Sequence, residues 1–328
     1  MCTAITLQTT RRQVLLGCTM DFSYPLAPEL FFIPRGYQWE SVLAPNSFQD
    51  QYSILGIGQD ISPVILADGV NEAGLAAAAL YFPGYAHYDA PITGATSPSV
   101  AAVELVHLLL GQCASVSHAA ALLRDIRIVG IEDSVTHSVA PLHWILTDQS
   151  GECMVAEKME DGLHCLPNPI GVLSNSPCFS WHMANLNQYM NIAPRQHTSA
   201  AWGRVSLVPF GQGAGTFGLP GDYTPPSRFV RAAYLKSHGT PVSTTAAGVI
   251  AGFHLLESVS IPKGAVITQR GTPDYTQYTA LIDLSAPAYY FKTYDNSQIA
   301  TAALPVYGRS LRSLGRLNRP MVFESFPS

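Results

Sequence analysis

Charge is scarce in this sequence, and positive charge is scarcer still. Asp, Glu, Lys and Arg make up 12% of the 328 residues, against ~25% in typical soluble domains. Lys and Arg together number only 18, the net charge is −5, and no basic cluster is present. Because a nucleic-acid-binding face requires such a cluster, we expect no nucleic-acid partner. The 47% of apolar residues exclude an intrinsically disordered chain.

Long apolar runs are also missing. The best candidate, Leu105–Leu123, carries no charge but includes His107, Gly111 and Gln112, which favours buried helices over a membrane span. The opening MCTAITLQTTRRQ lacks the basic start and following apolar run of a secretory signal. We therefore expect no membrane partner and a cytoplasmic location.

Metal and cofactor motifs are absent as well. The six cysteines form no Cys-x-x-Cys pair and no His-Glu-x-x-His motif occurs, so we expect free thiols and no metal. Residues 213–218 match the dinucleotide pattern Gly-x-Gly-x-x-Gly, but Pro220 follows where a helix should begin. We interpret them as a glycine-rich turn and expect no cofactor. The absence of Gly-x-Ser-x-Gly argues against a serine hydrolase.

Turn-forming residues are abundant, with 26 Gly and 24 Pro, which is typical of a β-rich protein. Alternation over Thr3–Gln8, a polar break near Thr10–Arg11 and the apolar Val14–Leu16 predict an N-terminal hairpin. No repeat or linker divides the chain, so we expect one α+β domain over residues 1–328. Helices are predicted over Ser99–Gln112, Ser115–Asp125, Phe179–Met190, Pro226–Ser237 and Thr244–Leu256, and later strands over Leu142–Thr147, Cys153–Lys158, Ala265–Thr268, Gln277–Leu284 and Tyr289–Tyr294.

Cys2 is the candidate nucleophile that remains. If Met1 is removed, Cys2 becomes the first residue and carries a thiol and an α-amine together. The thiolate is a strong nucleophile, and an α-amine titrates close enough to neutrality to act as the base through a bridging water. The predicted hairpin would bring Asp21 beside Cys2, where its carboxylate would accept a hydrogen bond from the amine.

Several longer motifs carry a family resemblance that runs nearly end to end. They are MCTAITL at the start, TMDF at 19–22, LYFPGYA at 80–86, PLHWILTD at 141–148, VLSNSP at 172–177, GDYTPPSRFVRAAY at 221–234 and IPKGAVIT at 261–268. With these motifs the sequence resembles the choloylglycine hydrolases. That family comprises penicillin V acylases and conjugated bile salt hydrolases, and belongs to the N-terminal nucleophile superfamily.

The resemblance implies an αββα four-layer sandwich with two antiparallel sheets, assembled as a homotetramer. By its place in the motifs, Cys2 is the nucleophile once the initiator methionine is lost, and Asp21 holds its amine. The side-chain amide of Asn175 and the backbone amide of Tyr81 are the implied oxyanion donors. Arg228 lies near the catalytic centre and favours the charged form of neighbouring groups.

One position departs from the family pattern. Relatives usually carry an arginine just before Thr-Met-Asp or Asn-Met-Asp, and this chain has Cys18 there. A neutral thiol removes a positive charge that would favour the Cys2 thiolate. A catalytically weak or silent ligand-binding relative is therefore an alternative, as is a regulatory disulfide between Cys18 and Cys2.

The substrate is expected to be a small-molecule linear amide. In the family, Tyr at the position of Tyr81 is typical of penicillin V acylases, whereas bile salt hydrolases tend to have Asn there. Tyr81 therefore favours a phenoxyacetyl-like acyl group, with Met20, Phe22 and the loop from Ile131 to residue 140 completing an apolar pocket. Conjugated bile salts are the first alternative substrate, and other N-acyl amides such as acyl-homoserine lactones remain open.

Overall fold

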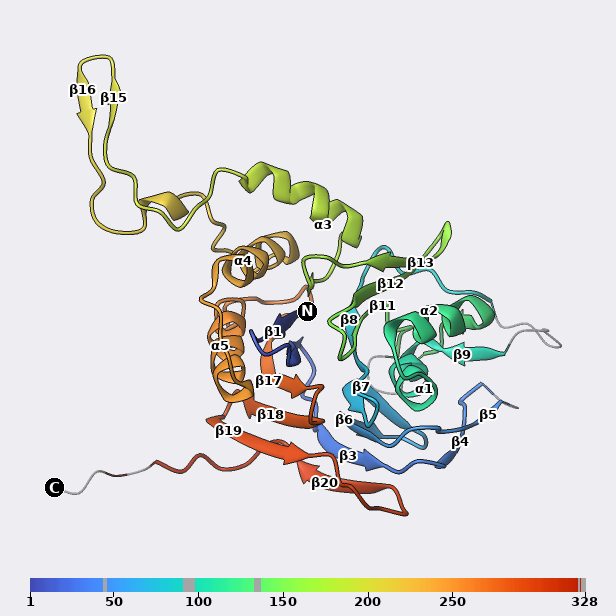
Figure 1. Ribbon diagram of the computed structural model, residues 1–328. Coiled ribbons are helices and arrows are strands. Elements are labelled where there is room, and N and C mark those ends of the chain that lie inside the picture. Colours follow the sequence, from blue (N-terminus) through green and yellow to red (C-terminus); the bar gives the residue numbers. More distant parts are fainter. Residues whose placement is uncertain (44–45, 91–97, 133–136, 324, 326–328) are drawn as a thin grey trace.

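Two antiparallel sheets face each other at the centre of the molecule (Figure 1). The computed structural model describes all residues except 44–45, 91–97, 133–136, 324 and 326–328. The first sheet has six strands in the order β14-β1-β2-β17-β18-β19, so the N-terminal hairpin lies in its interior. Its strands are β1 (Cys2–Gln8), β2 (Val14–Phe22), β14 (Val172–Leu173), β17 (Tyr275–Asp283), β18 (Ala288–Thr293) and β19 (Asn296–Ala303).

The second sheet has eight strands in the order β13-β12-β11-β8-β7-β6-β3-β20. Its strands are β3 (Glu29–Ile33), β6 (Ile54–Asp60), β7 (Val64–Asn71), β8 (Ala76–Tyr81), β11 (Leu142–Thr147), β12 (Cys153–Met159), β13 (Gly162–Pro167) and β20 (Arg312–Arg316). Three short pairs lie outside both sheets, namely β4 (Gln38–Glu40) with β5 (Ser47–Gln49), β9 (Ser99–Ala101) with β10 (Arg127–Val129), and β15 (Ala200–Trp202) with β16 (Val205–Leu207).

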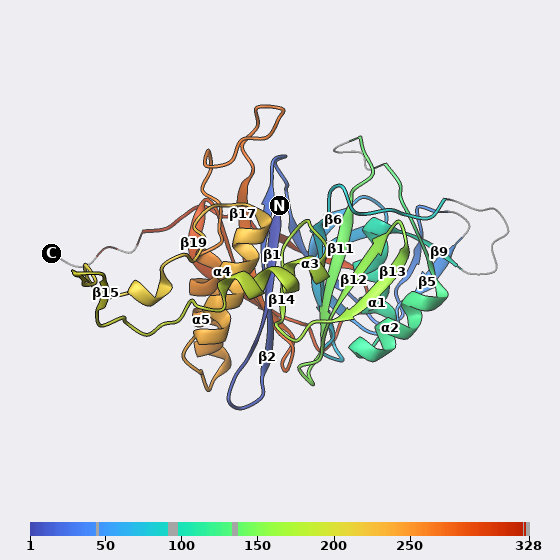
Figure 2. The same cartoon turned by 90° about the horizontal axis from the view of Figure 1, so that it is seen from above.

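Helices cover the outer face of each sheet (Figure 2). α4 (Pro225–His238) and α5 (Thr245–Glu257) pack on the six-stranded sheet, and α3 (Phe179–Asn185) packs on α4. On the other side, α1 (Leu105–Gln112) packs on β7 and β8, and α2 (Val116–Asp125) follows it. The order of layers is therefore helix, sheet, sheet, helix, and the predicted αββα sandwich is confirmed.

A buried carboxylate joins the two sheets. Asp68 on β7 accepts hydrogen bonds from the hydroxyls of Tyr278 at 2.6 Å and Tyr289 at 2.5 Å, which stand on β17 and β18. Burial raises the pKa of the Asp68 carboxyl, and the two tyrosine hydroxyls oppose that rise. Asp68 therefore ties the eight-stranded sheet to two neighbouring strands of the six-stranded sheet.

Most predicted elements are present, and two are wrong. Ser115 caps α2 by accepting the His118 N–H, and Thr244 caps α5, as their sequences predict. The helix expected from Ser99 begins only at Ala102, with one turn of 3-10 helix before α1, because residues 99–101 pair with the distant β10. Ala265–Thr268 forms a bend with a single isolated β-bridge, from Ile267 to Pro273, instead of a strand. The glycine-rich segment 213–218 folds as a short turn, as interpreted.

Candidate active site

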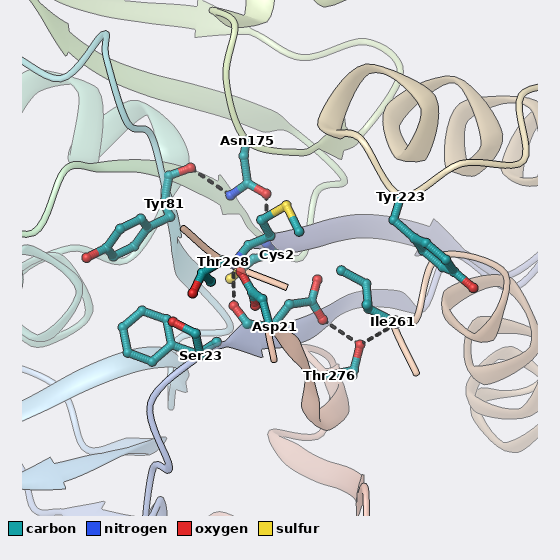
Figure 3. Close-up of polar contacts among 12 residues, drawn as sticks. Cys2, Asp21, Ser23, Tyr81, Asn175, Tyr223, Ile261, Thr268 and Thr276 are labelled. Carbon is teal, nitrogen blue, oxygen red and sulfur yellow. Dashed lines mark hydrogen bonds and ion pairs between the residues drawn. The ribbon is translucent and has the colours of Figure 1, made fainter. Parts of the chain in front are cut away.

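Cys2 begins β1, an inner strand of the six-stranded sheet (Figure 3). It lies opposite Met20 in the β1–β2 hairpin, and only 5% of its surface is exposed. The expected register is therefore correct to within one residue, because Cys2 does stand beside the 18–21 stretch. Cys18 lies opposite Ala4, which makes it the diagonal neighbour of Cys2 on the same face of the hairpin.

The side chain of Asn175 is held in one orientation beside Cys2. Its Oδ1 accepts from the Cys2 N–H at 2.8 Å and from Arg228 Nη2 at 2.7 Å. Its Nδ2 donates to the carbonyl of Tyr81 at 2.6 Å (Figure 3). Since both neighbours of Oδ1 are donors and the Tyr81 carbonyl only accepts, the amide cannot be flipped. Within the described residues, the second hydrogen of Nδ2 has no acceptor.

Arg228 connects the nucleophile strand to α4. Its Nη1 donates to the carbonyl of Cys2 at 2.7 Å and to Thr3 Oγ1 at 2.5 Å, and lies 3.8 Å from Asp21 Oδ2. The guanidinium is fully buried, and burial lowers its pKa while Asp21 opposes that fall. A buried cation therefore lies against the main chain of Cys2.

Asp21 is buried and hydrogen-bonded on both oxygens. Thr276 Oγ1 donates to Oδ1 at 2.5 Å (Figure 3). Thr19 Oγ1 donates to Oδ2 at 3.2 Å. Burial raises its pKa, and Arg228 is the largest opposing influence. The backbone of Asp21 pairs with Met1, because its N–H donates to the Met1 carbonyl at 2.8 Å and its own carbonyl accepts from the Met1 ammonium.

Sequence reasoning missed the groups that surround the N-terminus. The Met1 ammonium lies 3.5 Å from Asp274 Oδ2, and Thr276 on β17 holds Asp21. Thr276 lies in β17, which pairs with β2 only after folding, and Asp274 directly precedes that strand, so no local pattern in the sequence indicates either residue. While Met1 is present, the Cys2 N–H donates to Asn175; the contact between Asp21 and a mature Cys2 amine therefore stays a prediction.

The thiol of Cys2 experiences opposing electrostatic influences. Burial raises its pKa above the usual value, and the nearby Asp21 carboxylate adds to the rise. The N-terminal ammonium is the largest influence in the opposite direction, and Arg228 also lowers the pKa. Hydrolysis of the Met1–Cys2 peptide bond would release Met1 with its amine and create a new α-ammonium on Cys2. That positive charge would lie closer to the sulfur, which favours the thiolate.

An apolar cavity of about 500 Å³ opens beside Cys2. The predicted pocket residues Met20, Phe22, Tyr81 and Ile131 all line it together with Cys2. The rings of Phe22 and Tyr81 meet edge to face, with centroids 5.6 Å apart. Residues 133–136 of the predicted pocket loop lie outside the described residues. Further lining residues, which the sequence did not single out, include Val42, Ile57, Leu66, Ala79, Leu142 and Tyr278.

Cys18 is tied to the buried carboxylate between the sheets. Its Sγ donates to Asp68 Oδ2 at 3.6 Å, and burial followed by the Asp68 charge raises its pKa well above the usual value. Cys18 and Cys2 are both free thiols. A disulfide between diagonal positions would require one strand to shift, because directly opposed residues are the closer ones.

We expect Cys18→Arg to lower the pH at which Cys2 becomes reactive. A guanidinium diagonal to Cys2 favours the thiolate, but Asp68 would offset part of its charge, so the shift should be about one pH unit or less. The measurement is the rate of iodoacetamide inactivation against pH, with reductant present. Cys18→Leu is the neutral control and should leave the profile in place. Superimposable profiles for the Arg variant and the parent would show that charge at this position does not reach the nucleophile.

The fold and this site define the class of protein. A cysteine at the start of an inner strand of an αββα sandwich, with a buried asparagine and arginine on its main chain, is the arrangement of an N-terminal nucleophile hydrolase. A C2A variant of a conjugated bile acid hydrolase from Clostridium perfringens has the same fold, with a TM-score of 0.92, 32% identity and full coverage of both chains. Penicillin V acylase from Agrobacterium tumefaciens shares the fold at 22% identity, with a TM-score of 0.74 over 92% of this chain and 86% of its own.

The chain belongs to the choloylglycine hydrolase family of linear amide C–N hydrolases, which matches residues 2–307. Two similar relatives are named bile salt hydrolase/transferase. One, from Clostridium perfringens, is 37% identical over 91% of both chains. The other, from Lactiplantibacillus plantarum, is 35% identical over 93% of this chain and 92% of its own. The protein is therefore a hydrolase of amide C–N bonds, as the resemblance implies.

No helix in the described part of the chain is long and apolar enough to cross a membrane.

Proposed function

We propose that this amidase accepts a bulky, largely apolar acyl group and that conjugated bile salts are its principal substrates. The observation that carries the proposal is the apolar cavity of about 500 Å³ that begins at Cys2, a volume within the usual range for sites that bury most of a drug-sized ligand. The relatives at 37% and 35% identity are named for bile salt hydrolysis, whereas the penicillin V acylase supports the fold alone.

In the proposed reaction, amide hydrolysis proceeds through a thioester on Cys2. After loss of Met1, the Cys2 amine takes the thiol proton, and the thiolate attacks the amide carbonyl to form a tetrahedral oxyanion. The free hydrogen of Asn175 Nδ2 and the Tyr81 backbone N–H stabilise that charge. The amine then returns the proton to the leaving nitrogen as the C–N bond breaks. Water, activated by the same amine, hydrolyses the thioester and regenerates Cys2.

A cation near the site suits an acidic leaving group such as glycine or taurine. Arg270 is exposed and donates to Ser23 Oγ at 2.7 Å, and Ser23 directly follows the cavity residue Phe22. Its guanidinium stacks over the ring of Tyr24 at 4.0 Å. Within the described residues Arg270 makes no ion pair with a carboxylate, so its charge is open to a carboxylate or sulfonate.

Phenoxyacetyl amides are the second candidate substrates, and the pair of Tyr81 and Phe22 favours them. The two rings meet at the cavity wall, where an aryl group could pack against them. Cys2 lines the cavity, and the buried Asn175 and Arg228 hold its main chain. This arrangement favours a catalytic role for Cys2 over the silent ligand-binding alternative.

Turnover of glycine- and taurine-conjugated bile salts and of phenoxyacetyl amides tests the proposal. We expect bile salts to give the higher kcat/KM. We also expect Tyr81→Asn to lower the phenoxyacetyl to bile-salt ratio of kcat/KM by roughly fivefold, the equivalent of one lost aromatic contact. Tyr85→Asn, outside the cavity, is the matched control. Preference for phenoxyacetyl amides in the parent would reverse the ranking, and an unmoved ratio would restrict Tyr81 to its backbone role.

We also propose that the chain assembles as a homotetramer. The arm formed by β15 and β16 projects away from the body (Figure 1) and exposes Trp202, Val205 and Leu207. Apolar side chains at the end of such an arm are buried only when another molecule covers them. The proposed partner that covers them is a second copy of the chain.

A cytoplasmic location is the last part of the proposal. All six cysteines are free thiols, and one of them is the nucleophile. A reducing compartment keeps thiols in that state.

A further inference from the structure

A group of buried side chains beside the oxyanion residues is not used by the mechanism above. It consists of His143 on β11, Glu157 on β12 and His182 on α3, none of which is exposed to solvent. His143 Nδ1 lies 3.0 Å from Glu157 Oε1, and both Glu157 oxygens accept the Phe179 N–H, at 2.9 and 3.2 Å. Since Phe179 is the first residue of α3, the carboxylate holds the start of the helix that carries His182.

His182 contacts the oxyanion residue itself. Its Nε2 lies 2.7 Å from the carbonyl oxygen of Asn175, and because a carbonyl only accepts, Nε2 carries the proton. Burial lowers the pKa of His182 to about 4, so the ring is neutral near pH 7 and its single proton is the one on Nε2. The ring stacks on Phe229, with centroids 4.6 Å apart. Phe229 follows Arg228, which holds the side chain of the same asparagine.

The group also reaches the second oxyanion residue. The ring of His143 stacks on Phe82, with centroids 4.3 Å apart and planes within 7°. Phe82 follows Tyr81, whose carbonyl accepts from Asn175 Nδ2. The contacts therefore form a closed path from Asn175 through α3, β12 and β11 back to Tyr81.

We propose that His182 is a positioning residue for the oxyanion site. It fixes the main chain of Asn175, so that the free Nδ2 hydrogen points at the place where the oxyanion forms. The inference rests on the proposed role of Asn175 as an oxyanion donor. Such donors act only when held to within about half an ångström, and small displacements cost large factors in rate. His143 and Glu157 serve the same end by holding α3 and the Tyr81 segment.

His182→Phe tests the proposal, because it keeps a ring on Phe229 and removes the donor to Asn175. The substrate is p-nitrophenyl acetate, whose attack by the thiolate forms an oxyanion and releases p-nitrophenolate without depending on the natural acyl group. We expect kcat to fall by roughly 10-fold to 100-fold with KM within about twofold. His182→Gln, whose amide N–H can reach the same carbonyl, should restore most of the rate.

Alkylation by iodoacetamide separates positioning from general damage. Displacement of iodide by the Cys2 thiolate forms no oxyanion, so its rate and its pH profile should match the parent in both variants. Leu109→Ala, in the helix layer on the far side of the eight-stranded sheet, is the control for stability. It should lower the unfolding temperature and leave kcat unchanged, which would show that lost stability alone does not slow the reaction.

Three results would overturn the proposal. These are an unchanged kcat in His182→Phe, a parallel loss of alkylation, or a Gln variant no better than the Phe variant. If His182→Phe does not fold, Phe229→Leu replaces it, because the smaller side chain loosens the His182 ring and should lower kcat in the same selective way. Failure of the parent to cleave bile salts or phenoxyacetyl amides would count against the proposed function, while the acetate ester would still decide the role of His182.

Discussion

Cys2→Ala is expected to abolish amide hydrolysis while leaving the fold intact. The side chain lost is the proposed nucleophile, and the alanine still fits the inner strand, opposite Met20, without a polar group left unpaired. Activity should fall to the background of the assay, and circular dichroism should be unchanged. Cys2→Ser should retain little or no activity, because an alkoxide is far harder to form at neutral pH than a thiolate.

The matched control is Cys153→Ala, since this cysteine is also a free thiol but lies outside the cavity. It should keep parental activity. Burial raises the pKa of the Cys153 thiol to about 12, so this thiol is protonated at neutral pH. Mass spectrometry of the active enzyme should show that Met1 is absent. Parental activity in Cys2→Ala, or an active enzyme that retains Met1, would refute an N-terminal nucleophile.

Asn175→Ala should lower kcat by roughly 10²–10³, the usual cost of one oxyanion donor. KM should change far less, because this hydrogen bond strengthens only as charge develops on the substrate oxygen. Steady-state kinetics on the better amide substrate provide both constants. A large rise in KM at constant kcat would instead make Asn175 a substrate-binding residue.

Asn175→Asp is a sharper version of the same experiment. The carboxylate keeps an acceptor for the Cys2 N–H and for Arg228, which hold Oδ1 at 2.8 and 2.7 Å. It removes the donor to Tyr81 and places negative charge beside the forming oxyanion. The Asp variant should therefore be slower than the Ala variant. Asn187→Ala, on an exposed turn, is the control and should be silent.

Local patterns in the sequence predict the secondary-structure elements that short-range interactions determine. The β1–β2 hairpin follows from period-two alternation and a polar break, and its register differs by one residue from the expected one. Helix caps at Ser115 and Thr244 are visible because the capping bond spans only three residues. The helix expected from Ser99 fails for the opposite reason, since its first residues pair with a strand that follows α2.

The candidate site depends on contacts between distant parts of the chain. Asn175 and Arg228 reach Cys2 across 173 and 226 residues, and no periodicity encodes such contacts. Only the family motifs pointed to these two residues. Asp68, which accepts from Cys18, and His182, which contacts the Asn175 carbonyl, belong to no motif. Their contacts are therefore visible only in the folded chain.

The bond between Asp68 and Tyr278 has a consequence for how the acyl cavity can evolve. Tyr278 lines the cavity, and its hydroxyl is committed to a carboxylate on the opposite sheet. Loss of that hydroxyl would leave a buried acceptor short of a partner, at a cost of about 1–3 kcal/mol. Apolar lining residues such as Val42 and Leu142 make no such hydrogen bond. One can be replaced by a larger side chain when the other is replaced by a smaller one, at little cost in stability. Relatives of this chain with different acyl preferences should therefore vary at these aliphatic lining residues and keep a tyrosine at the position of Tyr278.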